Sequence, residues 1–292
     1  IDTNLFEGRT GSGLYVQELA GDLRVRGASA TTGTVMLTAA GAILDGNPLE
    51  GPADITAPEI VLTAIGGGIG TLADALEIQL AGGRLWASAQ GDIVLTAIAG
   101  ALDLRAVVST AGSIVLRTRD AIDSTGEDIT LAADSVLRAQ AGHITLQAGD
   151  DIVAAAGSRI QAGGTVTLRV DVDSADVGIG GTADLRGSIQ AASVDIAGAA
   201  DDDRFALTGA LSATRIDGAG GNDRIHLGSL ATPQAGGGGL LDGFAALVTV
   251  VGGGGEDLLV ADGEGDTRAH TGTLTASLLK GLGMAGGIAY DG

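Results

Sequence analysis

The sequence predicts an all-β chain folded as a parallel β-helix, a solenoid in which short strands stack coil upon coil. Three observations favour this class. A short apolar phrase recurs along the chain, 51 of the 292 residues are glycine, and 45% are hydrophobic although only one Trp, two Tyr and three Phe are present. A core of Ala, Val, Ile and Leu with Gly-rich corners suits short stacked strands.

The recurring phrase alternates apolar and mostly polar residues after an opening Gly, Asp or Glu. Such a period of two is the pattern of a half-buried strand. Weaker apolar anchors lie between the copies, and we expect them to point inward too. The copies are Gly33–Ala39, Glu59–Ala64, Gly91–Ala97, Gly112–Thr118, Asp128–Ala133, Gly142–Ala148 and Gly164–Val170; the anchors are Ile43, Ile69, Leu102, Ile122, Ile152 and Ile160.

One coil of this kind cannot bury its own apolar face, so each coil must pack on its neighbours. About ten to twelve coils stacked at ~4.8 Å would give a rod of about 50–60 Å. No capping segment is recognisable, and we expect an uncapped fragment of a longer rod, with Ile1 and Gly292 as cuts. The best helical alternatives are Leu72–Leu80 and Leu274–Leu282, although glycines interrupt nearly every apolar stripe.

Two longer phrases extend this repeat, Asp54–Thr71 and Gly149–Leu168. They resemble the coil repeat of filamentous-haemagglutinin-type exoproteins, and the resemblance covers roughly residues 10–195. It implies a right-handed parallel β-helix, secretion, and a role in adhesion or biofilm. We therefore assign residues 1–196 to haemagglutinin-like coils.

We expect residues 197–292 to continue the β-helix with a different repeat pattern, and a Gly-rich loop lies near 233–239. Residues 240–292 look like repeat segments of giant bacterial surface proteins. Three phrases, which begin at Gly198, Gly218 and Gly252, place carboxylates in a turn before an apolar strand. They resemble the calcium-binding RTX nonapeptide G-G-x-G-x-D-x-U-x. The third matches every defined position, whereas the first two replace glycines by Ala or Asp.

The RTX resemblance implies Ca²⁺ as a cofactor, because carboxylate and backbone oxygens are the ligands that Ca²⁺ prefers. The copies start 20 and 34 residues apart and are not in tandem, so a full RTX roll is not present. The alternative is that Gly-Asp and Asn-Asp only form tight corners before strands. The candidate metal ligands are Asp203, Asn222, Asp223, Glu256 and Asp257.

Acidic residues dominate the charge, with 36 Asp and Glu against 16 Lys and Arg, a formal net charge of −20. Such a surface repels nucleic acid and anionic lipid, and it collects divalent cations. Cys is absent, which removes disulfides and thiolate metal sites. No run approaches the ~18 apolar residues of a membrane-spanning helix. We therefore expect neither nucleic-acid binding nor membrane insertion.

Catalysis finds little support in the sequence. Glycosidic chemistry needs clustered carboxylates, and the candidate clusters are Asp150-Asp151 and Asp201–Asp203. Few aromatic residues are available to form a sugar platform. The three histidines have no zinc-ligand spacing. We expect His143 to be exposed, and His226, one residue past an inward anchor, to point outward. The protein is therefore not expected to be an enzyme.

The main functional hypothesis is a structural and adhesive segment of a large secreted bacterial surface protein, acting in cell adhesion, biofilm or filament formation. Its partners would be a host or neighbouring-cell surface, a polysaccharide, or other copies of itself, and its location would be extracellular or on the bacterial cell surface. One alternative is a Ca²⁺-dependent folding module of a type-I-secreted protein. Another is a polysaccharide-binding or lyase-like β-helix.

Overall fold

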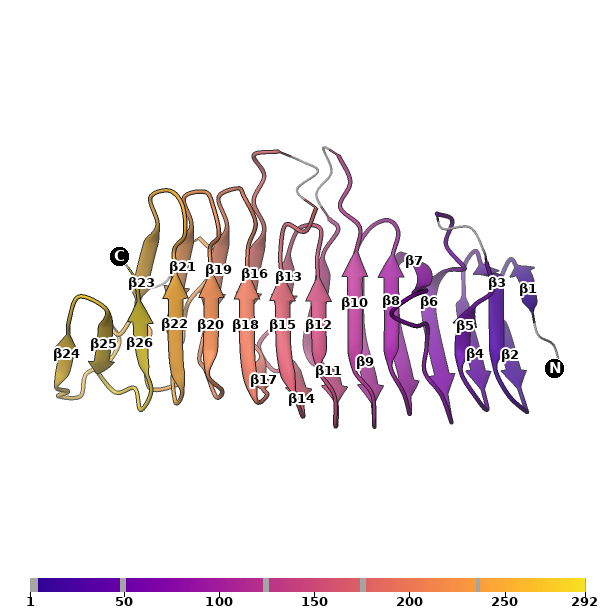
Figure 1. Ribbon diagram of the computed structural model, residues 1–292, viewed down its shortest axis with the longest axis horizontal. Helices are drawn as coiled ribbons and strands as arrows, with labels where there is room; N and C mark the ends of the chain where they lie inside the picture. Colours follow the sequence, from indigo (N-terminus) through magenta and orange to yellow (C-terminus); the bar gives the residue numbers. More distant parts are fainter. Residues whose placement is uncertain (1–4, 48–50, 123–125, 174–176, 235–236, 292) are drawn as a thin grey trace.

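The computed structural model is an elongated stack of β-strands, and it describes residues 5–47, 51–122, 126–173, 177–234 and 237–291. Figure 1 shows the strands side by side along one axis, with the two termini at opposite ends. One 26-stranded, mostly parallel sheet winds through the described part of the chain, and no helix occurs there. The predicted all-β class and stacked parallel strands are thus confirmed.

The strands are short because Gly-rich corners interrupt them every few residues. They are β1 (Phe6–Thr10), β2 (Leu14–Glu18), β3 (Leu23–Ala30), β4 (Thr34–Ala39), β5 (Ile43–Asp45), β6 (Ile55–Ala64), β7 (Leu76–Ala89), β8 (Ile93–Ala97), β9 (Leu102–Ser109), β10 (Ile114–Thr118), β11 (Ile129–Ala139), β12 (Ile144–Gln147), β13 (Ile152–Ala154), β14 (Arg159–Ala162), β15 (Thr165–Arg169), β16 (Thr182–Leu185), β17 (Ser188–Gln190), β18 (Ser193–Ala197), β19 (Arg204–Leu207), β20 (Thr214–Asp217), β21 (Arg224–Leu227), β22 (Leu247–Val251), β23 (Leu258–Ala261), β24 (Gly272–Leu274), β25 (Leu278–Gly281) and β26 (Gly287–Tyr290).

One stack of inward side chains runs almost the full length of the molecule. Each member pairs in parallel with the equivalent residue of the next coil, and all are buried. Burial of aliphatic side chains in contact with like side chains is the main force that holds such coils together. The stack consists of Leu23, Ile43, Ile69, Ile93, Ile114, Ile144, Val166, Val194, Thr214, Val248 and Ile288.

Every copy of the recurring phrase forms part of a strand with its Leu buried, but the copies occupy different faces. Leu37 and Leu62 stack on each other and then on Ala87 of β7. The Leu residues of four later copies form a second stack, Leu95, Leu116, Leu146 and Leu168. Leu131 of the remaining copy stacks on Leu104 of β9 in a third position. Identical sequence patterns therefore serve different walls of the solenoid.

The helical alternatives do not form. Leu72–Leu80 and Leu274–Leu282 form turns and strands, because β7 and β25 pair with neighbouring strands there. One of the predicted inward anchors is wrong. Among the weaker anchors, Ile122 is 76% exposed, whereas the other five are buried. Ile122 lies past the end of β10, so no neighbouring strand covers it.

The sheet continues without interruption across residue 197, since β18 pairs with β20 and β16 with β19. The loop near 233–239 leaves the solenoid between β21 and β22, and its residues 235–236 lie outside the described part, as do Ile1 and Gly292. Its far end returns inward, where Phe244 is fully buried and bridges to Ala210.

The last parallel strand does not have the bare edge expected from the sequence. β26 pairs in parallel with β22 on one side and antiparallel with β25 on the other, and β24 pairs antiparallel with β25. Figure 1 shows β25 and β24 extending one face of the rod beyond β26.

Candidate functional site

The predicted carboxylates gather at one corner of successive coils. Asp203, Asp223 and Asp257 directly precede β19, β21 and β23, which pair in parallel. The N–H of Asp203 donates to Asp223 Oδ1 at 2.8 Å, and the N–H of Asp223 donates to Asp257 Oδ1 at 3.0 Å. These three residues form the inner aspartate ladder. Asp203 thus stacks on Asp223 in the adjacent coil.

A second row runs beside this ladder. The N–H and the side-chain amide of Asn222 both donate to Asp202 Oδ1, at 2.7 and 3.1 Å. The N–H of Glu256 then donates to Asn222 Oδ1 at 3.0 Å. Asp202 was not among the predicted metal ligands. All five predicted ligands thus lie at one corner, but in two rows, and in both rows side-chain oxygens accept backbone hydrogen bonds.

Each inner aspartate packs against the glycine that opens its phrase. A Cβ built on Gly198, Gly218 or Gly252 would overlap Oδ2 of the aspartate five residues later. The glycine is needed because the carboxylate occupies the space that a side chain would take. This contact explains the Gly of the repeated phrase without invoking a metal ion.

Burial changes the acidity of this ladder. Burial, with the negative charge of Asp223 as a further cause, raises the pKa of Asp203 to about 7. Burial likewise raises the pKa of Asp223 to about 6, with the charge of Asp257 as a further cause. Within the described residues, Asp223 Oδ2 is buried without a hydrogen-bond partner. The ladder therefore still binds protons at pH values where an ordinary aspartate is fully ionised.

The candidate catalytic carboxylates are also engaged with the backbone. Asp150 Oδ2 accepts the N–H groups of Gly126 and Glu127 at 2.6 and 2.8 Å, and Asp151 Oδ1 accepts that of Thr182 at 2.7 Å. Hydrogen bonds of this kind fix the path of the chain from one coil to the next. They place these carboxylates in the structural corners of the solenoid.

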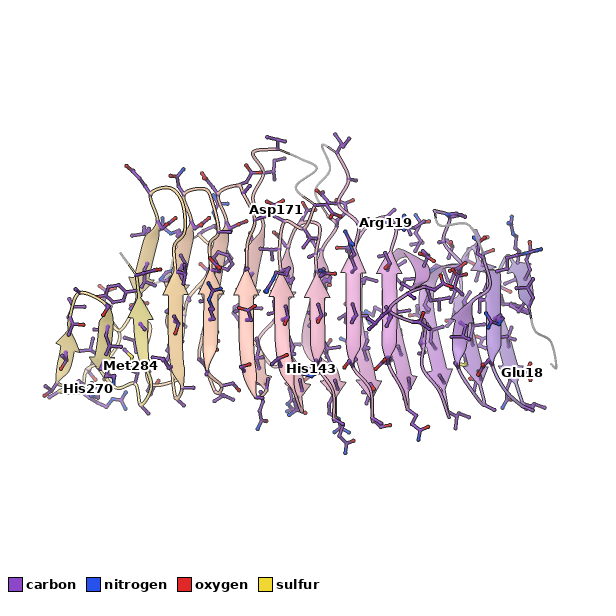
Figure 2. The ribbon with its side chains drawn as sticks, viewed as in Figure 1. Glu18, Arg119, His143, Asp171, His270 and Met284 are labelled. Carbon is purple, nitrogen blue, oxygen red and sulfur yellow. The ribbon has the colours of Figure 1, made fainter. Side chains whose placement is uncertain are left out.

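The histidines are dispersed, and Figure 2 shows His143 midway along the rod and His270 near its C-terminal end. His143 is exposed, as expected, and its ring accepts or donates at Thr165. The expectation that His226 points outward into solvent is wrong in part. It faces away from the core, but it is only 2% exposed because the loop after β21 covers it, with Nδ1 3.3 Å from Thr232 O.

Two other acidic groups were not predicted as metal ligands. Among the described residues, carboxylate oxygens of Asp45, Asp54 and Glu77 lie within 4.8 Å of one another, and so do those of a second group, Asp120, Glu127 and Asp150. A signal for the first group exists in the sequence. Asp54 and Glu77 each precede an isoleucine, and these two isoleucines, Ile55 and Ile78, pair in adjacent coils.

Comparison with known proteins finds no matching family model, no matching curated protein and no matching solved structure. The described part of the chain contains no helix that is long and apolar enough to span a membrane.

Proposed function

We propose that this chain is a structural and adhesive segment of a large secreted bacterial surface protein, located outside the cell or on its surface. The observation that carries the proposal is the unbroken inward stack from Leu23 to Ile288. A solenoid held by nearest-neighbour contacts forms a stiff rod with long, regular outer faces. Right-handed winding through about ten to twelve coils is part of the proposal.

One outer face offers a surface for contact with a partner. A groove of about 450 Å³ is lined by side chains of β11, β14 and β17, among them Arg138, Gln161 and Gln190. These three residues are stacked in register. Guanidinium and amide groups donate and accept hydrogen bonds, and such groups in a row suit a chain of sugar hydroxyls. Because the net charge of −20 repels polyanions, we propose a neutral polysaccharide as the partner.

Binding to a panel of neutral and uronate polysaccharides, measured by biolayer interferometry in EGTA, tests this function. The double variant Gln161→Ala/Gln190→Ala should lose at least tenfold in affinity. Gln90→Ala is the matched control, because Gln90 is exposed on an earlier coil away from this groove. A monomer by ultracentrifugation that binds none of these polymers would count against an adhesive role. Release of unsaturated uronate ends would instead favour the lyase-like alternative.

A second candidate function is a Ca²⁺-dependent folding module. The observation that favours it is the inner aspartate ladder, in which buried carboxylates of Asp203 and Asp223 lie in adjacent coils. A cation bound only by the folded chain would shift the folding equilibrium. Thermal melts in EGTA and in millimolar Ca²⁺ test it. An upward shift that is lost in Asp223→Asn/Asp257→Asn supports this candidate, and identical melts in both conditions refute it.

A further inference from the structure

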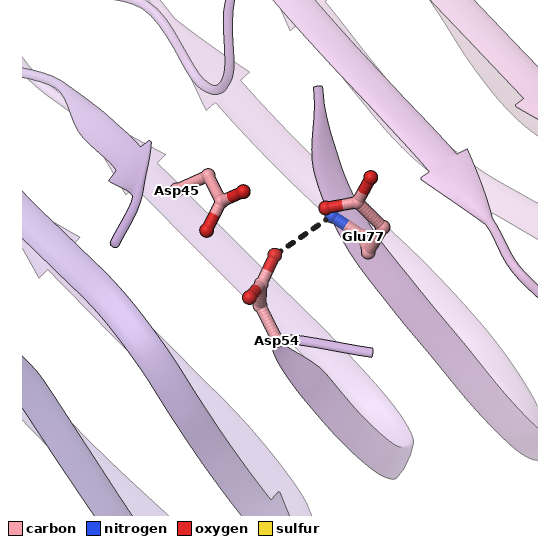
Figure 3. Close-up of side chains that lie close together, drawn as sticks. All are labelled: Asp45, Asp54 and Glu77. Atoms are coloured by element: carbon pink, nitrogen blue, oxygen red, sulfur yellow. Dashed lines mark hydrogen bonds between the residues drawn. The ribbon is translucent and has the colours of Figure 1, made fainter. Parts of the chain in front are cut away.

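The acidic cluster of Asp45, Asp54 and Glu77 is the most confined group of charges in the N-terminal coils. The three side chains are 6%, 1% and 3% exposed. Asp45 is the last residue of β5, Asp54 directly precedes β6, and Glu77 is the second residue of β7. Figure 3 shows the three carboxyl groups close together. Burying several carboxylates together is unfavourable unless positive charge compensates them.

The backbone fixes Asp54 in place. Its N–H donates to the carbonyl of Glu77 at 2.9 Å, and the N–H of Glu77 donates to Asp54 Oδ2 at 3.0 Å. The carbonyl of Asp54 accepts the N–H of Ala28 at 2.7 Å. Three hydrogen bonds across two coils therefore hold this residue, and its side chain cannot turn toward solvent without breaking one of them.

One oxygen of this fixed carboxyl group accepts no hydrogen bond within the described ranges. Asp54 Oδ1 is buried and has no hydrogen-bond partner among the described residues. Buried carboxylate oxygens are normally hydrogen-bonded, so such an atom needs an explanation, and a bound ion is one such explanation. This orphaned oxygen is an observation separate from the clustering of the acids.

Charges of both signs act on this cluster. Arg119 pairs with Glu77 Oε1 at 3.8 Å. Burial raises the pKa of Asp45, and the negative charge of the exposed Asp74 is a further cause. Burial, with the charge of Asp45 as a further cause, raises the pKa of Asp54 to about 7. The ion-free cluster thus retains a proton near neutral pH.

We propose that Asp45, Asp54 and Glu77 bind a divalent cation, with Ca²⁺ as the best fit. The ligand set is all oxygen, which suits a hard cation. Opposite ligands of Ca²⁺ at ~2.4 Å are about 4.8 Å apart, and the three carboxylate oxygens lie within 4.8 Å of one another. Asp74 at the exposed rim adds negative charge on the entry side. This site is distinct from the inner aspartate ladder and does not depend on the adhesive proposal.

Isothermal titration of CaCl₂ into EGTA-stripped, desalted protein tests the site, with the variant Asp54→Asn. Asn can still accept the Glu77 N–H, so the coil contact is retained while the charge is lost. We expect at least a tenfold loss of Ca²⁺ affinity. Asp184→Asn is the matched control, because Asp184 is a buried aspartate of β16 that belongs neither to this cluster nor to the inner aspartate ladder, and it should leave this binding unchanged.

If Asp54→Asn does not fold, Asp74→Asn at the exposed rim should still lower the affinity severalfold. Wild-type affinity in both variants, or no Ca²⁺ or Mg²⁺ binding at millimolar concentration, would overturn the proposal. Neither result bears on the adhesive proposal, because polysaccharide binding is measured in EGTA, without bound Ca²⁺.

Discussion

The N–H of Asp203 donates a hydrogen bond to Oδ1 of Asp223, 20 residues later in the chain, across 2.8 Å. Asp223 repeats this contact with Asp257, 34 residues later, across 3.0 Å. Coils of different length thus meet at the same corner with the same geometry. The inner aspartate ladder therefore fixes the strand register between these coils, which the flexible glycine-rich turns would not fix on their own.

Replacement of Asp223 by Ala should lower the free energy of unfolding by about 1–3 kcal/mol, because the buried N–H of Asp203 loses its acceptor. Asp223→Asn keeps an acceptor oxygen and removes one of three stacked charges. It should be at least as stable as the wild type at pH 7.5. Urea unfolding followed by circular dichroism measures both. Equal destabilisation by Asn and Ala would argue that the charge, not the hydrogen bond, matters here.

Gly218→Ala should also destabilise the protein, by about 1–3 kcal/mol, because the new methyl group would overlap Asp223 Oδ2 and force the ladder apart. Gly11→Ala is the matched control, since a Cβ at that glycine meets no atom within 4 Å. Thermal melts of the two variants compare them directly. A wild-type melt for Gly218→Ala would show that the corner can relax around a side chain.

Stability should fall as the pH rises from about 4 to about 7. In this window the unfolded chain has lost its aspartate protons, at a pKa of ~3.9, whereas folded Asp203 and Asp54 keep theirs up to about 7. The folded state then binds more protons, so the slope of unfolding free energy against pH is negative. Melts in EGTA from pH 4.5 to 8 measure it, and Asp203→Asn should flatten the curve. A rising curve would contradict the sign.

Truncation of the inward stack should be costly. Ile144 is fully buried between Ile114 and Val166, and Ile144→Ala should cost about 2–5 kcal/mol through lost burial and a cavity. Ile122→Ala is the control of the same chemistry, because Ile122 is 76% exposed. It should change the free energy of unfolding by less than about 0.5 kcal/mol. Urea unfolding measures both variants, and similar losses would contradict the assigned core.

The apolar periodicity was sufficient to predict the strands and their stacking. Alternation within each phrase identifies the inward side chains, and Leu37, Leu95 and Leu168 are all buried as expected. It could not predict which wall each copy would form. That depends on the number of residues between strands. The wall of Leu37 and Leu62 continues through Ala87 and Val107, whereas Leu95 and Leu116 lie on another wall.

The candidate sites were only partly predictable. A repeated Gly and Asp five residues apart indicated a turn at Asp203 and at Asp223, and the two residues lie on adjacent coils of one corner. The cluster around Asp54 was missed because its members are 9 and 23 residues apart and do not recur at one position of the repeated phrase. Only the parallel pairing of Ile55 with Ile78 brings Asp54 and Glu77 together, and pairing between coils is a long-range property.

The longer coil between Asp223 and Asp257 shows what the scaffold tolerates. It carries 14 more residues than the coil from Asp203 to Asp223, 34 against 20, yet the hydrogen bond to the next aspartate is kept. The additional residues leave between β21 and β22 and return at Phe244. This position is therefore a natural grafting point, where a foreign peptide or a small folded domain could be displayed from the side of the rod while the strands on either side remain in register.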